Sequence, residues 1–250
     1  MAGLDPAISL RQARNITKRD RRDKPGDDNL MRKTFIAAAL IAASFGTQPA
    51  AADALTFGPD LAGWTVVEFP GIAPVHFTAS DNETLAIAAD SAAGMLWRPL
   101  PGAMRQARVA HWRWRVDDAV AATDLTKRGA DDRAVAIYFV FSEQPGAATS
   151  PMQTLASPAV TALVYVFGGD KPRGTVIASP HMAERGQFIV LRAADAPKHV
   201  WHEESIKLAP DYARAFGRKA PALIGVAISS DSDNTHARNR ANVQNLAIGE

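Results

Sequence analysis

The chain of 250 residues contains no cysteine. Disulfide bonds and thiolate metal sites are therefore excluded, even in an oxidising compartment. The six histidines form no H-E-x-x-H pair, so we expect no zinc site. A glycine-rich phosphate loop and a G-x-S-x-G elbow are also missing, which argues against a P-loop nucleotide site and a serine hydrolase of that type.

Long hydrophobic runs are lacking too. The longest, at 34–46, has about a dozen residues, well short of the roughly 20 that a membrane-spanning helix needs. It follows the basic Met31-Arg32-Lys33 and precedes small residues at 50–54, an order typical of a secretory signal peptide. We predict a signal peptide over 31–54, cleaved after Ala52 or Ala54. The protein would then be periplasmic or secreted, in a Gram-negative bacterium.

Residues 1–30 are polar and charged, without an apolar period. Because signal peptides begin at the start of a chain, we predict that Met31 is the initiator. Residues 1–30 would then be a disordered extension translated from upstream DNA. The alternative is that they form a genuine basic arm of the protein. Nine of the 28 Lys and Arg and five of the 26 Asp and Glu lie in 1–52. The remainder has 19 basic and 21 acidic residues, a net charge near −2, which removes the support for nucleic-acid binding.

From Leu55 onward the hydrophobic period is two. Short alternating segments end at Gly, Pro, Asn or Asp about every ten residues, which is typical of a β-sandwich or barrel. The strands we predict cover 64–69, 74–79, 84–89, 94–100, 108–116, 134–141, 162–167, 187–191, 198–206, a stretch from 222 into Asp231, and 242–248. With no repeat or linker, 55–250 is predicted to be one all-β domain.

Five stretches carry sharper predictions. In 108–116, one face is core and the other is basic; the core face has Ala110, Trp112, Trp114 and Val116, and the basic face has His111, Arg113 and Arg115. Segments 134–141 and 162–167 are apolar on both faces, which indicates central strands. Residues 142–157, rich in Gly, Pro and Ser, predict a mobile loop.

A short helix is expected at 208–217, with Pro210 in its first turn, Gly217 at its end and Tyr212 and Phe216 on its buried face.

An ordered set of motifs resembles one known family. The set is Trp112-x-Trp114-x-Val116, Gly129-x-Asp131-Asp132-Arg133, Tyr138-x-Val140-Phe141, Tyr165, Trp201, Asp211-Tyr212-x-x-x-Phe216-Gly217 and Ile228-Ser-Ser-Asp-Ser-Asp-Asn-Thr235. The chain is similar over about 95–249 to the bacterial domain-of-unknown-function family numbered 3047. The resemblance implies a secreted β-sandwich of jelly-roll type, and it implies no reaction.

The apolar strand from Ala222 runs into a polar group that is the first candidate site: Asp231, Asp233, Asn234 and Thr235. Oxygen ligands at Asp231 and Asp233 suit calcium. An EF-hand is excluded, because His236 stands where its tight-turn Gly belongs and Asn242 where its bidentate Glu belongs. The alternatives are a ligand site and a strand exit whose polar side chains satisfy backbone donors.

A second acidic group, Asp131-Asp132, precedes the strand at 134. If the strands at 134 and 222 are neighbours, we expect antiparallel pairing to place these carboxylates at the opposite end from Asp231. An alternative role is structural, with Arg113 or Arg115 forming ion pairs to Asp131 or Asp132 across the sheet face.

The leading hypothesis is an exported, non-catalytic β-sandwich that binds a glycan or another cell-envelope ligand, with no cofactor other than possible calcium. Its candidate ligand-binding residues are Asp131, Asp132, Asp231, Asp233, Asn234, Arg113 and Trp201. The second hypothesis is a polysaccharide-acting enzyme. A glycoside hydrolase would use a carboxylate pair, and a lyase would use His or Tyr as base beside Arg or Asn, with His111, Arg113, Tyr138 and Asn234 as candidates. The third is a structural or interaction protein without a small ligand.

Overall fold

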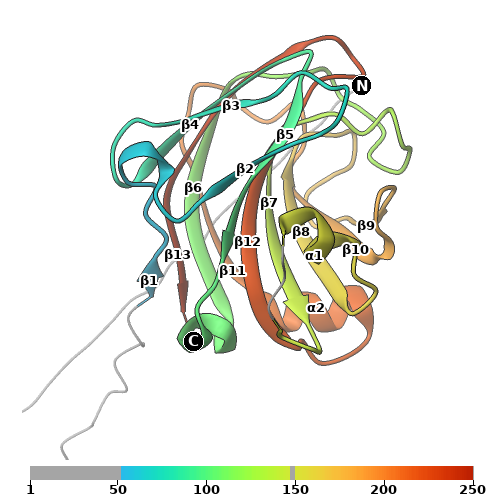
Figure 1. Cartoon of the computed structure of the whole chain (residues 1–250). Helices are drawn as coiled ribbons and strands as arrows, with labels where there is room; N and C mark the ends of the chain where they lie inside the picture. The colour runs from blue at the N-terminus through green and yellow to red at the C-terminus, as the bar shows by residue number, and fades with distance from the viewer. Residues whose placement is uncertain (1–51, 147–149, 250) are drawn as a thin grey trace, which may run out of the picture. The chain divides into compact units, whose positions relative to one another are not determined.

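The computed structural model describes residues 52–146 and 150–249. They form two β-sheets packed face to face, with few helices (Figure 1). The predicted extension 1–30 and nearly all of the predicted signal peptide lie outside the described residues. No helix of the described part is long and apolar enough to cross a membrane. The all-β sandwich predicted from the alternating pattern is confirmed.

One sheet has six strands in the order β11-β6-β13-β4-β3, and β1 pairs with β13. All of its pairs are antiparallel. The strands are β1 Asp53–Ala54, β3 His76–Ala79, β4 Thr84–Asp90, β6 Val109–Asp118, β11 His202–Lys207 and β13 Arg238–Gly249. A short 3-10 segment, η1 Pro59–Leu61, precedes β3, and another, η2 Gly102–Gln106, precedes β6.

The other sheet has seven strands in the order β2-β5-β12-β7-β8-β10-β9. The strands are β2 Thr65–Glu68, β5 Ala93–Pro99, β7 Arg133–Ser142, β8 Val160–Phe167, β9 Val176–Ser179, β10 Ala183–Arg192 and β12 Ala222–Asp231. Its pairs are antiparallel except β8 with β10, which is parallel. The central position of β7, β8 and β12 agrees with their apolar sequences.

The main core lies between the sheets. On β6, Trp112 and Trp114 point into it and are 2% and 0% exposed, so they are core rather than sugar platforms. They contact Tyr165 of β8 and Phe167 of β8, at centroid distances of 5.8 and 5.7 Å. Edge-on aromatic contacts of this kind add about 0.5–1.5 kcal/mol each beyond their burial. The predicted two-faced pattern of 108–116 is therefore confirmed.

The outer face of the seven-stranded sheet is also apolar, which explains why its central strands alternate so little. Residues such as Met95, Tyr138, Val164 and Phe188 form a second buried cluster there. A helix over part of the predicted loop, α1 Pro151–Ala156, lies beside β7 and β8 in Figure 1. The loop prediction for 142–157 is therefore wrong over these six residues. Ser150 caps α1 by accepting a hydrogen bond from the Gln153 N–H at 3.2 Å.

The predicted helix near 208–217 is present as α2, Leu208–Phe216. Gly217 ends it in the left-handed region, at φ 67°. Tyr212 is fully buried, and its ring lies 4.4 Å from that of Phe216, so the four-residue spacing does give the packed face.

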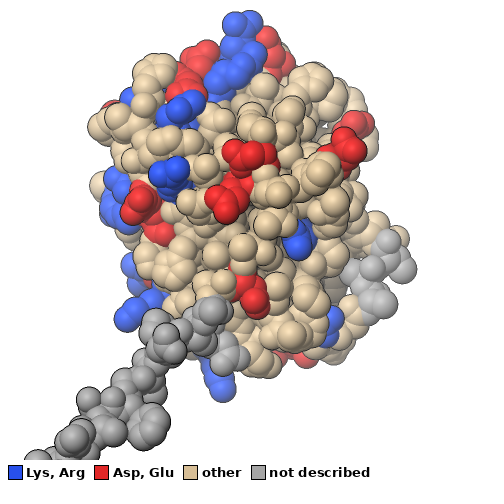
Figure 2. Space-filling view, turned by 90° about the vertical axis from the view of Figure 1, so that its left-hand side faces the viewer, with Lys and Arg blue, Asp and Glu red and all other residues tan. Residues whose placement is uncertain are grey.

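Figure 2 shows the face that lies on the left of Figure 1. Lys and Arg are interspersed there with Asp and Glu, and the described residues form no large area of one charge on this face. Long-range attraction to a polyanion needs a concentrated basic patch, and this face offers none.

Candidate functional site

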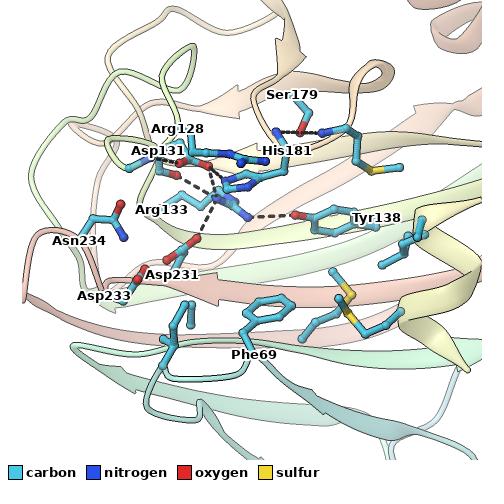
Figure 3. A pocket seen from close by; sticks show the side chains of 18 of the residues that line it. Phe69, Arg128, Asp131, Arg133, Tyr138, Ser179, His181, Asp231, Asp233 and Asn234 are labelled. Atoms are coloured by element: carbon cyan, nitrogen blue, oxygen red, sulfur yellow. Dashed lines mark hydrogen bonds and ion pairs between the residues drawn. The ribbon is translucent and has the colours of Figure 1, made fainter.

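A pocket of about 670 Å³ lies on the outer face of the seven-stranded sheet (Figure 3). Its walls come from the β2–β3 connection, β5, the loop before β7, α1, the β9–β10 turn and the residues after β12. Its volume lies within the range of about 300–1,000 Å³ that is typical of small-molecule sites.

The polar end of the pocket forms where β7 begins and β12 ends. The two strands pair antiparallel, with Asp231 opposite Arg133. The start of an antiparallel strand adjoins the end of its partner, so Asp131 and Asp231 lie at the same end of the sheet. The expectation that antiparallel pairing would separate them was therefore wrong in its geometry. The residues before β7 and the end of β12, about 100 residues apart in the chain, therefore bring their carboxylates together in one acidic group.

Arg133 is at the centre of this end. It is 5% exposed and lies over the Phe188 ring at 5.3 Å. Its Nη1 donates to the Asp131 backbone oxygen at 2.9 Å and to side-chain oxygens of Asp131 and Asp231 at 3.4 and 3.3 Å, while its Nη2 donates to the Tyr138 hydroxyl at 2.9 Å. Burial alone would lower the pKa of Arg133, but Tyr138, Asp231 and Asp131 outweigh it and raise that pKa, so the guanidinium stays charged.

Asp131 is buried and joins Arg133 to His181. Its Oδ2 lies 2.9 Å from His181 Nε2, and its Oδ1 accepts the Gly129 N–H at 3.2 Å. Burial tends to raise the pKa of Asp131, but the His181 hydrogen bond and the Arg133 charge dominate and lower it, so Asp131 is ionised at neutral pH. The imidazole of His181 is about half exposed and lines the pocket.

The β9–β10 turn places His181 and Met182 in the pocket. Ser179 Oγ accepts the backbone N–H groups of both residues, each at 3.3 Å, which fixes the turn. Gly186 allows the turn to fold close to β10, because a Cβ there would lie 2.8 Å from Met182 Cβ and 2.9 Å from Ser179 Cβ. Neighbouring Ala183 has φ 50°, a conformation that alanine rarely adopts. The turn is therefore held in one geometry against the pocket.

A second acidic group lies beside Arg133. Asp132, Asp231 and Asp233 each offer one carboxylate oxygen, and these oxygens lie within 4.8 Å of one another. Asp132 Oδ2 accepts the Thr235 N–H at 2.7 Å and the Thr235 hydroxyl at 2.6 Å. Burial, with a hydrogen bond to Asp233 and the charges of Asp132 and Asp233, raises the pKa of Asp231 to about 8, although Arg133 opposes the shift. Asp231 Oδ1 is buried and accepts no hydrogen bond from a basic, hydroxyl or backbone donor of the described residues, and a proton shared with Asp233 helps to hold the pKa of Asp231 up.

Asn239 of β13 fixes the backbone on which these groups stand. Its side-chain amide donates to the backbone oxygens of Arg133 and Asp231, at 3.0 and 2.8 Å, and its Oδ1 accepts the Val120 N–H at 3.0 Å. Asn239 is fully buried. It therefore joins the six-stranded sheet to the two strand ends that carry the polar groups.

The other end of the pocket is apolar. Its lining comprises Phe69, Ile72, Ala93, Met95, Met152, Leu155, Ala156 and Met182. Arg185 holds α1 in place by donating to the backbone oxygens of Leu155 and Ser157, at 3.1 and 2.9 Å. Figure 3 shows the methionine sulfur atoms on one side and Asp131, Asp231, Asp233 and Asn234 on the other. The pocket is therefore amphipathic.

The sequence-predicted site residues fall into two places. Asp131, Asp231, Asp233 and Asn234 line the pocket, and Asp132 lies directly behind them on Thr235. Arg113 and Trp201 are absent from its lining and lie together on the six-stranded sheet, with Arg113 Cζ 4.9 Å from the Trp201 ring centroid. Seven residues predicted as one group thus form a pocket group and a separate cation–π pair.

The predicted ion pairs across the sheet face are contradicted. Arg113 donates to Gln244 Oε1 at 2.6 Å, and Arg115 forms its ion pair with Asp117 at 2.9 Å. Asp131 instead pairs with Arg133 and His181. Of the residues suggested for a lyase, Tyr138 and Asn234 line the pocket, while His111 and Arg113 lie on β6 of the other sheet.

Sequence reasoning missed three contributions to the site. Arg133 was treated only as part of a motif, although a charged residue before an apolar strand is a signal of a buried ion pair. Met152 on α1 lay in a segment predicted as loop, where Ser150-Pro151 is a recognisable helix start. His181 lay in a stretch for which no element was predicted, and no local pattern connects it to Asp131.

Among solved structures, the chain is similar at low identity to several polysaccharide-degrading enzymes. The xyloglucanase domain of NopAA, a type three effector from Sinorhizobium fredii, aligns with 81% of this chain and 99% of its own at 9% identity and a TM-score of 0.44. A cellulase derived from Cel12A of Rhodothermus marinus aligns with 75% of this chain and 91% of its own, at 14% identity and a TM-score of 0.42. The Trichoderma harzianum endoglucanase 3, from family GH12, aligns with 79% and 95%, at 12% identity and 0.41. Such low values carry no argument about function.

A search of the curated proteins finds no match. One family model covers most of the sandwich, from residue 62 to residue 247, in agreement with the resemblance noted in the sequence. The chain therefore belongs to the family described as "Protein of unknown function (DUF3047)".

Proposed function

We propose that this protein binds a polyhydroxylated ligand, the end of a glycan, in the pocket on its seven-stranded sheet. The ligand hydroxyls lie against the Asp131, Asp231 and His181 end. Carboxylates and imidazoles accept from and donate to hydroxyl groups with good geometry. The rigid network around Arg133 holds these groups in place before the ligand arrives, which lowers the entropic cost of binding.

The observation that carries the proposal is the unpartnered Oδ1 of Asp231. It belongs to a residue that lines the pocket, and it is a buried carboxylate oxygen that accepts no hydrogen bond from a donor of the described residues. A buried polar atom left without a hydrogen bond costs about 1–3 kcal/mol. A ligand hydroxyl at this position removes that cost, and an apolar group does not.

To test the proposal, each member of a panel of cell-envelope oligosaccharides is titrated into the purified protein, and its affinity is measured by calorimetry. We expect at least one oligosaccharide to bind saturably, and Asp231→Asn to weaken that binding at least about fivefold, because one carboxylate oxygen becomes an NH2 donor while Arg133 retains the remaining oxygen. Trp201→Ala is the matched control: its ring is outside the pocket, so the affinity stays unchanged. A panel without any binder, or equal losses in both variants, overturns the proposal.

A second candidate function, glycoside hydrolysis, is favoured by one observation. Asp131 and Asp231 both accept from Arg133 Nη1, at 3.4 and 3.3 Å, so these two oxygens lie less than about 7 Å apart. Glycoside hydrolases place their carboxylates at separations of roughly 5–9.5 Å. A lyase is less favoured, because the ionised Asp131 repels the uronate that it needs and Arg133 already donates to Asp131 and Asp231.

Reducing-end release from the oligosaccharides that bind separates the two candidates. Hydrolysis predicts turnover that Asp131→Asn removes while binding of intact oligosaccharide persists. Binding without turnover across the panel leaves the non-catalytic function. The structural alternative predicts neither binding nor turnover.

We also propose that the protein is exported after cleavage behind Ala52. Asp53 and Ala54 pair with Ile248 and Ala247 of β13, and a cut after Ala54 would remove both residues of β1. A cut after Ala52 keeps them. Mass analysis of the protein recovered from the periplasm tests this: a first residue other than Asp53, or recovery in the cytoplasm alone, contradicts it.

A further inference from the structure

The apolar end of the pocket is accessible although it is built from large side chains. Met152 is 46% exposed, one of three large apolar residues exposed to this degree in the described part, together with Val66 and Val200. Phe69, Leu155 and Met182 are only partly buried against the outer cluster. Exposed apolar surface of this kind, gathered in a hollow beside fixed polar groups, marks a ligand site rather than a scattered surface residue.

The composition of this end points to a flexible aliphatic partner. Sugar faces are bound by flat aromatic rings, and the apolar end of the lining offers one such ring, Phe69, and no tryptophan. Met95, Met152 and Met182 line the pocket instead. Methionine is unbranched and polarisable, and it adapts to flexible apolar groups of variable shape.

The two ends form one continuous pocket of about 670 Å³. Figure 3 shows the acidic side chains on one side, Arg133, His181 and Tyr138 between, and the methionine sulfurs beyond them. A ligand that used only the polar end would leave the methionine end in water. A ligand that fills both ends has a hydroxylated head and an aliphatic tail.

We infer that the pocket takes an amphiphile, a hydroxylated head group that carries an alkyl or acyl chain, with the chain lying against Met152, Leu155 and Met182. This inference rests on the proposed function for its head group and adds the chain. The polar end disfavours an anionic head, because Asp131 is ionised and the guanidinium beside it, Arg133, is already shared with Asp231.

The experiment varies the chain and the head separately. Butyl, hexyl and octyl β-glucosides, all below their micelle concentrations, are titrated into the purified protein beside glucose. Burial of each methylene strengthens binding about threefold to fourfold. Heptanoate and hexyltrimethylammonium, with the hexyl chain held constant, test the head: the glucoside should bind more tightly than the carboxylate.

Two variants locate the chain. Met152→Gln and Met182→Gln keep the side-chain length and put a polar group at the apolar end. The factor by which each added methylene increases the affinity should therefore fall toward one, while the affinity for glucose stays unchanged. Val66→Thr is the control, since Val66 is also 46% exposed but is not part of the lining. Met152 is exposed, so Met152→Gln should fold normally. It keeps the test informative if Met182→Gln fails to fold.

The outcomes separate the two proposals. A chain-length dependence that Met152→Gln reduces and Val66→Thr does not supports the inference. Affinities independent of chain length, or a dependence unchanged in Met152→Gln, overturn it and leave the glycan proposal standing. Chain-dependent binding that is equal for the glucoside, the carboxylate and the ammonium overturns the hydroxylated head while the aliphatic chain stands.

Discussion

Two clusters of buried charge in this protein differ in how completely they are paired. Glu204 of β11 is 4% exposed, and both of its carboxylate oxygens are satisfied: Oε1 accepts from Arg192 at 2.7 Å and Trp114 at 3.3 Å, and Oε2 accepts from Arg173 at 2.9 Å. The cluster around Arg133 is equally buried, yet Arg133 Nε and Asp231 Oδ1 have no hydrogen-bond partner within residues 52–146 and 150–249.

The difference separates a structural role from a functional one. Glu204 connects an edge strand of the six-stranded sheet to Arg192 of β10 and to the loop before β9, so it closes one edge of the sandwich. A complete set of hydrogen bonds leaves nothing for a ligand to do. The Arg133 cluster has unsatisfied hydrogen-bonding atoms beside a pocket, and a ligand can be recognised through such atoms. The same unsatisfied atoms lower the folding stability that the cluster contributes.

The largest effect is expected at Glu204. Glu204→Ala leaves Arg173, Arg192 and Trp114 without their shared acceptor, and breaking a buried pair from one side costs about 3–5 kcal/mol. We expect the free energy of unfolding, measured in urea, to fall by that amount. The neighbouring Glu203→Ala is the control, because Glu203 is exposed and should change stability by about 0.5 kcal/mol or less.

A loss below about 1 kcal/mol in Glu204→Ala would show that this cluster contributes no more than an ordinary surface pair. The comparison between a structural and a functional cluster would then have no basis.

Asp231→Asn is expected to act in the opposite direction, with a dependence on pH. The folded-state pKa of Asp231, about 8, lies above the ordinary 3.8, so folding favours its protonated form. Its contribution to stability is therefore complete below about pH 4 and is lost as the pH rises toward 8. Asparagine cannot ionise, so the variant avoids this loss and gains on the wild type, on the order of 1–3 kcal/mol near pH 8.

Urea unfolding at several values between about pH 4 and pH 8 measures this difference. Asp90→Asn is the control, because Asp90 is 59% exposed in its pair with Arg238 and its removal should leave the pH profile parallel to that of the wild type. Parallel profiles for Asp231→Asn would contradict the raised pKa of the buried Asp231 carboxyl. Gain of stability with loss of ligand affinity is the expected exchange at a binding site.

The fold could be predicted because its signals are local. The alternation of β6 assigned Trp112 and Trp114 to the core, and the caps of α2 assigned Pro210 and Gly217 to its two ends. The helix α1 was missed because six residues carry little periodicity and their Gly- and Pro-rich surroundings resemble a loop.

The site could be predicted only in part, because its geometry depends on which strands are neighbours. Asp131 and Asp231 were chosen as polar groups next to apolar strands, and both line the pocket. Their proximity follows from the pairing of β7 with β12, which the sequence does not encode locally. His181 reaches Asp131 across 50 residues through the parallel pair of β8 and β10 and the turn before it, a non-local arrangement without a sequence signal.

The smallest effect concerns the calcium that Asp231 and Asp233 suggested. With Asp132 they offer three carboxylates, but one oxygen of Asp132 is taken by Thr235 and one of Asp231 by Arg133. Calcium needs six to eight oxygens, and the Arg133 guanidinium repels a second cation nearby. We therefore expect millimolar calcium to raise the melting temperature by less than about 1 °C, equally in the wild type and Asp233→Asn. The opposite outcome is saturable stabilisation at micromolar calcium that Asp233→Asn abolishes. It would make the unpartnered Asp231 oxygen a metal ligand. The unused acceptor that distinguishes this cluster from the Glu204 cluster would then bind an ion and not a ligand hydroxyl.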